Sequence, residues 1–132
     1  MAHVYTKALV KGTKGQVEVG ELLVDTGATF TVLPVELLRE VGAYLMPTKT
    51  RLELGDGRAV ESDVYAVVLA IQDREGATLA VTFRDAKPVL GVRTLEDLGF
   101  KVDPVSGSLE PTRPAGVAYY YAGFEPTRVT GN

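Results

Sequence analysis

The sequence predicts a mostly β domain with two short helices. Apolar and polar residues alternate along several segments, and alternation with a period of two is typical of half-buried strands. Clusters that contain glycine and aspartate separate these segments, as expected of hairpin turns. Only two segments, 34–41 and 92–98, have the pattern of short helices, and each is followed by a glycine.

The expected strands follow one another along the chain, with short turns between them. Residues 16–24 alternate at first and become continuously apolar at 22–24, where the strand would enter a core covered on both faces. Residues 55–57 lie between two strand-like segments with polar flanks, which predicts a projecting hairpin and a candidate mobile flap. The expected strands are 3–10, 16–24, 49–54, 58–72, 77–83, 88–91, 100–102 and 108–110, with a turn at 73–76.

The composition argues against several kinds of site. The net charge of the 132-residue chain is -3, whereas a nucleic-acid partner needs a basic face. Cysteine is absent, which removes disulfides and thiolate metal sites and fits the cytoplasmic location that we expect. The single histidine, His3, gives little basis for a catalytic triad or a metal centre, so we expect no cofactor. No signal peptide is evident and no apolar run approaches the roughly 18 residues of a membrane span, so we expect no membrane partner.

Asp25 is the candidate catalytic residue. It follows the apolar residues 22–24 and precedes Thr26 and Gly27, and the sequence becomes apolar again at 30–33. A single carboxylate cannot easily hydrolyse an amide, because the reaction needs both a base and an acid. Two neighbouring carboxylates that share one proton supply both functions. Since the chain has one such acid, a twofold homodimer would have to bring two Asp25 side chains together.

The sequence resembles the single-lobe, retroviral-type (retropepsin-like) aspartic proteases, whose wider relatives include small prokaryotic members. Residues 23–28, Leu-Val-Asp-Thr-Gly-Ala, are similar to the family's active-site motif, and residues 32–34 to the apolar exit from its active-site loop. Residues 55–57 fall where the family has its flap tip, and residues 89–91 are similar to its second signature. The resemblance implies an aspartic-type endopeptidase with a closed β-barrel in residues 1–110 that forms a homodimer.

The resemblance also implies a role for each residue of these motifs. Asp25 would be half of the catalytic pair, and the Thr26 hydroxyl would hydrogen-bond across the dimer axis. Gly27 would let the substrate backbone approach closely, because glycine has no side chain. A peptide or protein substrate would bind in an extended form against the flap and the loop. The implied site residues are Asp25 as the catalytic residue; Thr26, Gly27 and Ala28 as its support; Thr29, Gly55, Asp56, Gly57 and Arg58 as substrate-binding and flap residues; and Val89, Leu90 and Gly91 as the second signature.

Two positions depart from the family pattern. Retroviral members usually carry an acid two residues after the motif glycine, where this chain has Thr29. After the second-signature glycine they often carry an arginine that pairs with that acid, whereas here Val92 follows and Arg93 comes one residue later. The sequence therefore allows an active homodimeric endopeptidase or a catalytically inactive peptide-binding or dimerisation module of the same fold. A third reading is an unrelated β-barrel binding protein in which Asp25 is an ordinary turn residue.

The C-terminal extension, residues 111–132, differs in character from the rest of the chain. Its three prolines disfavour regular structure, whereas its three consecutive tyrosines, 119–121, are costly to leave in water. We expect residues 117–122 to form a strand or docking segment that packs on the domain or on a partner, with a disordered tail as the alternative. As a hypothesis, this segment contributes to dimerisation.

Overall fold

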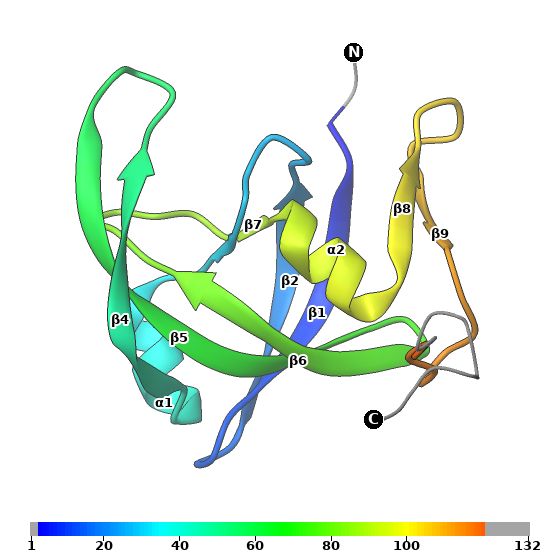
Figure 1. Ribbon diagram of the computed structural model, residues 1–132, viewed down its shortest axis with the longest axis horizontal. Helices are drawn as coiled ribbons and strands as arrows, with labels where there is room; N and C mark the ends of the chain where they lie inside the picture. The colour runs from blue at the N-terminus through cyan, green and yellow to red at the C-terminus, as the bar shows by residue number, and fades with distance from the viewer. Residues whose placement is uncertain (1–2, 121–132) are drawn as a thin grey trace, which may run out of the picture.

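The computed structural model describes residues 3–120, which form nine strands and two short helices (Figure 1). The mostly β class that the sequence predicts is confirmed. The strands are β1 Tyr5–Lys11, β2 Gln16–Val24, β3 Thr31–Val32, β4 Tyr44–Glu53, β5 Ala59–Ile71, β6 Arg74–Val81, β7 Val89–Leu90, β8 Phe100–Asp103 and β9 Ser108–Pro111. The helices are α1 Val35–Val41 and α2 Val92–Leu98.

Seven of the strands form one sheet in the order β1-β2-β7-β3-β6-β5-β4, and β1 also pairs with β5. The two-residue strand β7 lies between β2 and β3. It pairs in parallel with β2, with Leu23 opposite Val89, and antiparallel with β3, with Val32 opposite Val89. This arrangement brings three segments that are far apart in the sequence into direct contact. β8 and β9 form a separate two-stranded sheet.

Two apolar clusters fill the interior, because the inward-facing residues of the strands and helices are almost all apolar. The larger cluster lies between the sheet and both helices and includes Leu22, Leu38, Leu69, Leu90 and Leu98. The smaller cluster consists of Val32, Val64 and Val81, against which partly buried residues such as Phe30, Phe83 and Val89 pack. The smaller cluster underlies the groove described below.

Both helices end as the sequence predicts, at a glycine in the left-handed conformation. Gly42 follows α1 with φ of 75°, and Gly99 follows α2 with φ of 81°. The amide of each glycine donates to carbonyl oxygens of the helix's last turn, where the helix itself supplies too few donors.

Two strands begin three or more residues before the predicted position, and the two-residue strand β3 is not among the predicted strands. β4 begins at Tyr44 rather than at residue 49, since its first residues pair with β5 although they are largely exposed and show no clear alternation. β6 begins at Arg74 rather than at residue 77, because the β5–β6 ladder continues to the pair Ile71–Arg74. The charged residues at 73–75 indicated a solvated turn, but Arg74 is buried and donates to the carbonyl oxygens of Leu98 and Gly99.

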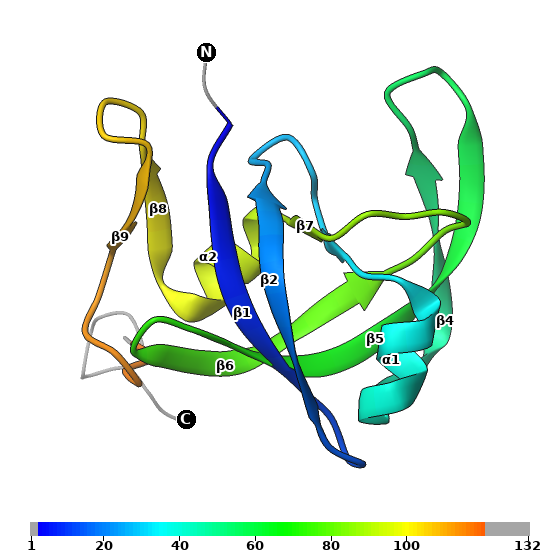
Figure 2. The same ribbon diagram turned by 180° about the vertical axis from the view of Figure 1, so that it is seen from behind.

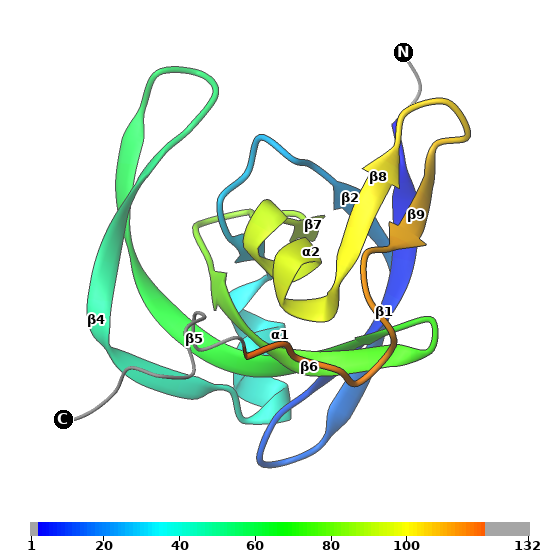
Figure 3. The same cartoon turned by 45° about the vertical axis from the view of Figure 1, so that its right-hand side comes forward.

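The loop after β2, the β4–β5 turn, the β8–β9 turn and the start of β1 lie at one end of the molecule (Figure 2). Residues 112–120 lie at the other end, below α2 (Figure 3). Residues 117–120 form no strand, and residues 121 and 122 of the predicted docking segment lie outside the described residues. Neither helix in residues 3–120 has the length and apolar character needed to cross a membrane.

Candidate active site

Asp25 stands immediately after β2, at the first position of the loop that leads to β3. Its backbone N–H donates to the carbonyl oxygen of Leu90 at 3.0 Å, and its own carbonyl oxygen accepts from the N–H of Ala28 at 3.0 Å. The N–H of Gly27 donates to Asp25 Oδ1 at 2.9 Å. The backbone therefore holds the carboxylate in a tight turn, and the side chain stays exposed in the single chain.

The second signature packs against this loop. The N–H of Val92 donates to the carbonyl oxygen of Ala28 at 2.8 Å, and the N–H of Arg93 donates to that of Thr29 at 3.1 Å. Position 91 requires a glycine because no side chain fits there: a Cβ atom would lie 2.3 Å from the carbonyl oxygen of Phe30. Its backbone conformation does not require glycine, since φ is -91°. The structure thus brings together the two sequence motifs that carry the resemblance.

The tip of the β4–β5 hairpin is ordered by a short set of hydrogen bonds. The N–H of Leu54 donates to the carbonyl oxygen of Arg58, and the N–H of Gly57 donates to that of Leu54. Gly57 has φ of 90°, a value that favours glycine. Asp56 accepts from the backbone N–H of Arg58 at 3.0 Å and from its Nε at 2.7 Å. These two contacts, the backbone one first, lower the pKa of Asp56 from its ordinary value.

A groove of about 690 Å³ lies between the Asp25 loop and the β4–β5 hairpin. Of the predicted site residues, six line it: Asp25, Gly27, Ala28, Thr29, Gly55 and Val89. The other six do not: Thr26, Asp56, Gly57, Arg58, Leu90 and Gly91. Sequence reasoning missed the remaining lining residues, which are mostly apolar: Phe30, Val32, Thr50, Arg51, Leu52, Glu53, Leu54, Val81 and Phe83. The alternation along residues 49–54 placed Leu52 and Leu54 on one face and could have assigned them to the groove.

The groove contains two carboxylates, which differ in how firmly they are held. Asp25 is fixed by the Gly27 amide, as described above. The Glu53 side chain is 81% exposed and lies 3.9 Å from Arg51 Nε, a distance too long for a hydrogen bond. One chain therefore offers a single well-positioned carboxylate in this groove.

The positions that depart from the family pattern have their own contacts. The Arg93 guanidinium lies over the ring of Phe30, 5.3 Å from its centre. Thr29 is exposed at the edge of the groove. Arg93 thus has an aromatic partner in the place where the resemblance implies an acid.

Thr26 is exposed at the outer turn of the Asp25 loop. Within the described part of a single chain, its hydroxyl makes no hydrogen bond. The partner that the resemblance implies for it belongs to a second copy of the chain.

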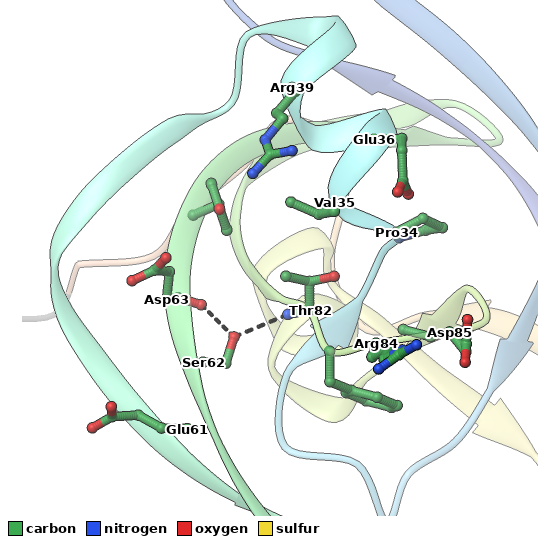
Figure 4. Close-up of a pocket in the computed structure, with 13 residues that line it drawn as sticks. Pro34, Val35, Glu36, Arg39, Glu61, Ser62, Asp63, Thr82, Arg84 and Asp85 are labelled. Carbon is green, nitrogen blue, oxygen red and sulfur yellow. Dashed lines mark hydrogen bonds between the residues drawn. The ribbon is translucent and has the colours of Figure 1, made fainter.

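A second hollow, of about 560 Å³, lies beside α1 and is separate from Asp25 (Figure 4). The Ser62 hydroxyl donates to the Asp63 carbonyl oxygen at 2.6 Å and accepts from the N–H of Thr82 at 3.1 Å. Both acidic and basic side chains line this second hollow. Phe83 is the one residue that lines both the hollow and the groove. Within residues 3–120, no three histidine, aspartate or glutamate side chains are grouped to hold a metal ion.

The sequence matches no protein-family model and no curated protein sequence. Among solved structures, the chain is similar to the EIAV protease in complex with the inhibitor HBY-793. The sequence identity is 23%, the match covers 77% of this chain and 93% of that chain, and the TM-score is 0.57. The chain therefore has the fold of a retroviral aspartic protease.

Proposed function

We propose that two copies of this chain form an aspartic endopeptidase, to which each copy contributes one Asp25. The observation that carries the proposal is the Asp25 carboxylate, which is exposed, fixed by the Gly27 amide and placed at the edge of a groove. The fold shared with the EIAV protease supports it. The proposal includes the closed barrel and the homodimer that the resemblance implies, and the flap predicted at the tip of the β4–β5 hairpin.

The second carboxylate comes from the second copy. Glu53 is the other acid of the groove, but no hydrogen bond fixes its side chain in the described part of the chain. The exposed loop that carries Asp25 lies at an end of the molecule, where a second copy can approach it (Figure 1). A twofold axis beside this loop brings two Asp25 side chains face to face, because symmetry pairs identical residues.

Two carboxylates held a few ångströms apart resist double ionisation, so the pair retains one proton. The ionised Asp25 takes a proton from a water molecule, whose oxygen attacks the carbonyl carbon of the peptide bond. The protonated Asp25 of the other copy donates its proton to the carbonyl oxygen. Collapse of the tetrahedral intermediate transfers a proton to the leaving amine and breaks the C–N bond, which yields an acid and an amine and leaves one proton on the pair.

The groove supports a substrate with apolar side chains in an extended conformation. Its lining includes five apolar residues: Phe30, Leu52, Val81, Phe83 and Val89. The β4–β5 hairpin acts as the flap, since its tip carries Gly55 at the groove and extends from two long paired strands. Closure of this hairpin excludes water from the reacting bond.

The second candidate is an inactive peptide-binding or dimerisation module of the same fold. Arg93 favours it, because its guanidinium lies over Phe30 and is not paired with an acid. In this case the groove still binds peptides, but no cleavage follows.

The test is cleavage of an unfolded protein at acidic pH by the wild-type chain and by Asp25→Asn. We expect Asp25→Asn to lose activity by about 10²–10⁴-fold, the usual contribution of acid–base groups, and to remain a dimer in sedimentation. A statine-type transition-state analogue should inhibit the wild type. Glu61→Gln, which removes an exposed acid outside the groove, is the control. An equal loss in Glu53→Gln would instead identify Glu53 as the second acid, and dimerisation without any cleavage would favour the inactive module.

A further inference from the structure

Three buried threonines and one aspartate form a continuous line of hydrogen bonds behind the Asp25 loop. The N–H of Gly91 donates to Thr31 Oγ1 at 3.1 Å. Thr31 Oγ1 lies 2.6 Å from Thr94 Oγ1, which lies 2.7 Å from Thr78 Oγ1. The Thr78 hydroxyl donates to Asp97 Oδ2 at 2.9 Å. We call these five residues the hydroxyl chain; its three threonines are buried and Asp97 is exposed.

The two ends of the hydroxyl chain determine the direction of every bond in it. A backbone N–H can only donate and a carboxylate can only accept, whereas each threonine hydroxyl has one proton to donate. Since Thr78 donates to Asp97, Thr94 must donate to Thr78, and Thr31 must donate to Thr94. The Thr31 oxygen is then left with its lone pairs facing the N–H of Gly91. A line of bonds with one direction is mutually polarising, so each bond strengthens its neighbours.

The hydroxyl chain ends on the segment that positions Asp25. Gly91 follows Leu90, whose carbonyl oxygen accepts from the N–H of Asp25. Gly91 also lies directly against the backbone of Phe30, where even a Cβ atom has no space. A small displacement of Gly91 therefore affects both sides of the Asp25 loop, because Gly91 is joined covalently to Leu90 on one side and has no spare space beside Phe30 on the other.

We infer that Asp97 is a positioning residue for the active site. Its carboxylate orients the three threonine hydroxyls, and through them it holds Gly91 and the Asp25 loop in place. Asp97 does not line the groove, so its role is to position the Asp25 loop and not to contact the substrate. The effect on catalysis rests on the proposed function, whereas the effect on the geometry of the loop does not.

The experiment compares Asp97→Leu with Glu96→Leu in the full-length chain. Both residues are exposed acids on α2, and within residues 3–120 the Glu96 side chain makes no hydrogen bond or ion pair. Amide hydrogen exchange and amide chemical shifts of Gly91 and Asp25 are measured by NMR. We expect faster exchange of the Gly91 amide and shifted resonances for both residues in Asp97→Leu, and neither change in Glu96→Leu. Asp97→Asn should restore the wild-type values, since its amide oxygen can accept from Thr78.

A second pair of variants tests the middle of the hydroxyl chain. Thr94→Val removes the hydroxyl with little change of shape, whereas Thr94→Ser keeps it. We expect Thr94→Val to reproduce the amide changes of Asp97→Leu and Thr94→Ser to restore the wild-type values. If Thr94→Val does not fold, the exposed position 97 still decides the question. The inference is overturned if the exchange rates and chemical shifts of the Gly91 and Asp25 amides change no more in Asp97→Leu than in Glu96→Leu.

Peptide cleavage provides the independent measurement. In Asp97→Leu we expect kcat to fall about tenfold with KM nearly unchanged, less than the roughly 10²-fold cost of a 1 Å misplacement. An equal fall in Glu96→Leu would overturn the positioning role. Absence of cleavage in the wild type would contradict the proposed function, and the amide measurements would still test the hydroxyl chain.

Discussion

The backbone N–H of Asp25 donates to the carbonyl oxygen of Leu90 at 3.0 Å and so joins two motifs that are far apart in the sequence. The bond continues the parallel pairing of β2 with β7, in which Val24 lies opposite Leu90. The position of the candidate catalytic carboxylate is therefore determined by the sheet and not by the loop alone. A rigid support of this kind favours a preorganised site, because no rearrangement is needed when substrate binds.

Gly91→Ala should be strongly destabilising. The new Cβ atom would lie 2.3 Å from the Phe30 carbonyl oxygen and 2.9 Å from the Thr31 nitrogen, both of which are backbone atoms that cannot rotate away. We expect the free energy of unfolding to fall by about 3 kcal/mol or more, at the upper end of the cost of overpacking. Chemical denaturation followed by circular dichroism measures this change.

Gly20→Ala is the matched control for this prediction. Gly20 also lies in a strand of the main sheet, but a Cβ atom there would meet nothing within 4 Å. We expect its free energy of unfolding to change by no more than about 1 kcal/mol. Equal stability of the two variants would show that the close contact between Gly91 and Phe30 is absent in solution.

Much of this framework could be predicted from the sequence, because it depends on local patterns. The apolar run before Asp25 and the glycines after each helix identify β2, α1 and α2. The boundaries of β4 and β6 could not be predicted, since tertiary contacts override local polarity there. Arg74 shows this clearly, because its charge indicates solvent although its guanidinium is buried against the end of α2.

The sequence predicts the motif residues of the candidate site but not the buried residues behind it. Asp25, Gly27 and Val89 were chosen from motifs, and all three line the groove. The buried hydroxyls of Thr31 and Thr94 were missed, because their pairing requires β3 and α2 to meet in three dimensions. A threonine within an otherwise apolar segment is the one local signal that could have indicated them.

The tip of the β4–β5 hairpin should lose an interaction in acid. Hydrogen bonds from Arg58 lower the pKa of Asp56 below its ordinary value of 3.8 in the folded chain. The ionised Asp56 therefore helps to order the tip at any pH above 3.8. This contribution is lost when the pH falls below 3.8 and passes the lowered pKa of the folded chain, because Asp56 is then protonated. An NMR titration of the Asp56 carboxyl and the Arg58 amide measures this transition.

Asp56→Asn provides the comparison for the titration. The amide oxygen can still accept from the Arg58 N–H, but the charge that attracts the guanidinium is removed. We expect the acid transition of the Arg58 amide to disappear in this variant. A transition of the wild-type Arg58 amide centred at or above pH 3.8 would contradict the prediction.

Arg113→Ala should loosen the end of α2. The guanidinium donates to the carbonyl oxygens of Glu96 at 3.0 Å, Asp97 at 2.7 Å and Val117 at 2.7 Å. Carbonyl groups in the last turn of a helix lack partners within the helix, so these contacts stabilise its end. We expect a loss of about 1–2 kcal/mol in the free energy of unfolding. Arg39→Ala, which removes an exposed arginine from α1, should change it by less than about 0.5 kcal/mol.

Truncation after Pro111 separates this role from the predicted interface role of residues 117–122. If Arg113 accounts for the contribution of residues 112–132 to stability, the truncated chain and Arg113→Ala lose similar free energies of unfolding. Sedimentation of the truncated chain then tests dimerisation independently. A normal dimer would contradict the hypothesis that residues 117–122 contribute to the interface.

Thr26→Val should weaken the proposed dimer without destabilising the single chain. The Thr26 hydroxyl makes no hydrogen bond within residues 3–120, so its removal should not lower the free energy of unfolding of a single copy. Across a twofold axis two equivalent bonds are lost, at about 1 kcal/mol each, which corresponds to a roughly thirtyfold larger dimer dissociation constant. Thr29→Val removes another exposed hydroxyl from the same loop and should leave the constant unchanged. Sedimentation equilibrium measures both variants, and identical dissociation constants would exclude a hydrogen bond of Thr26 across the axis.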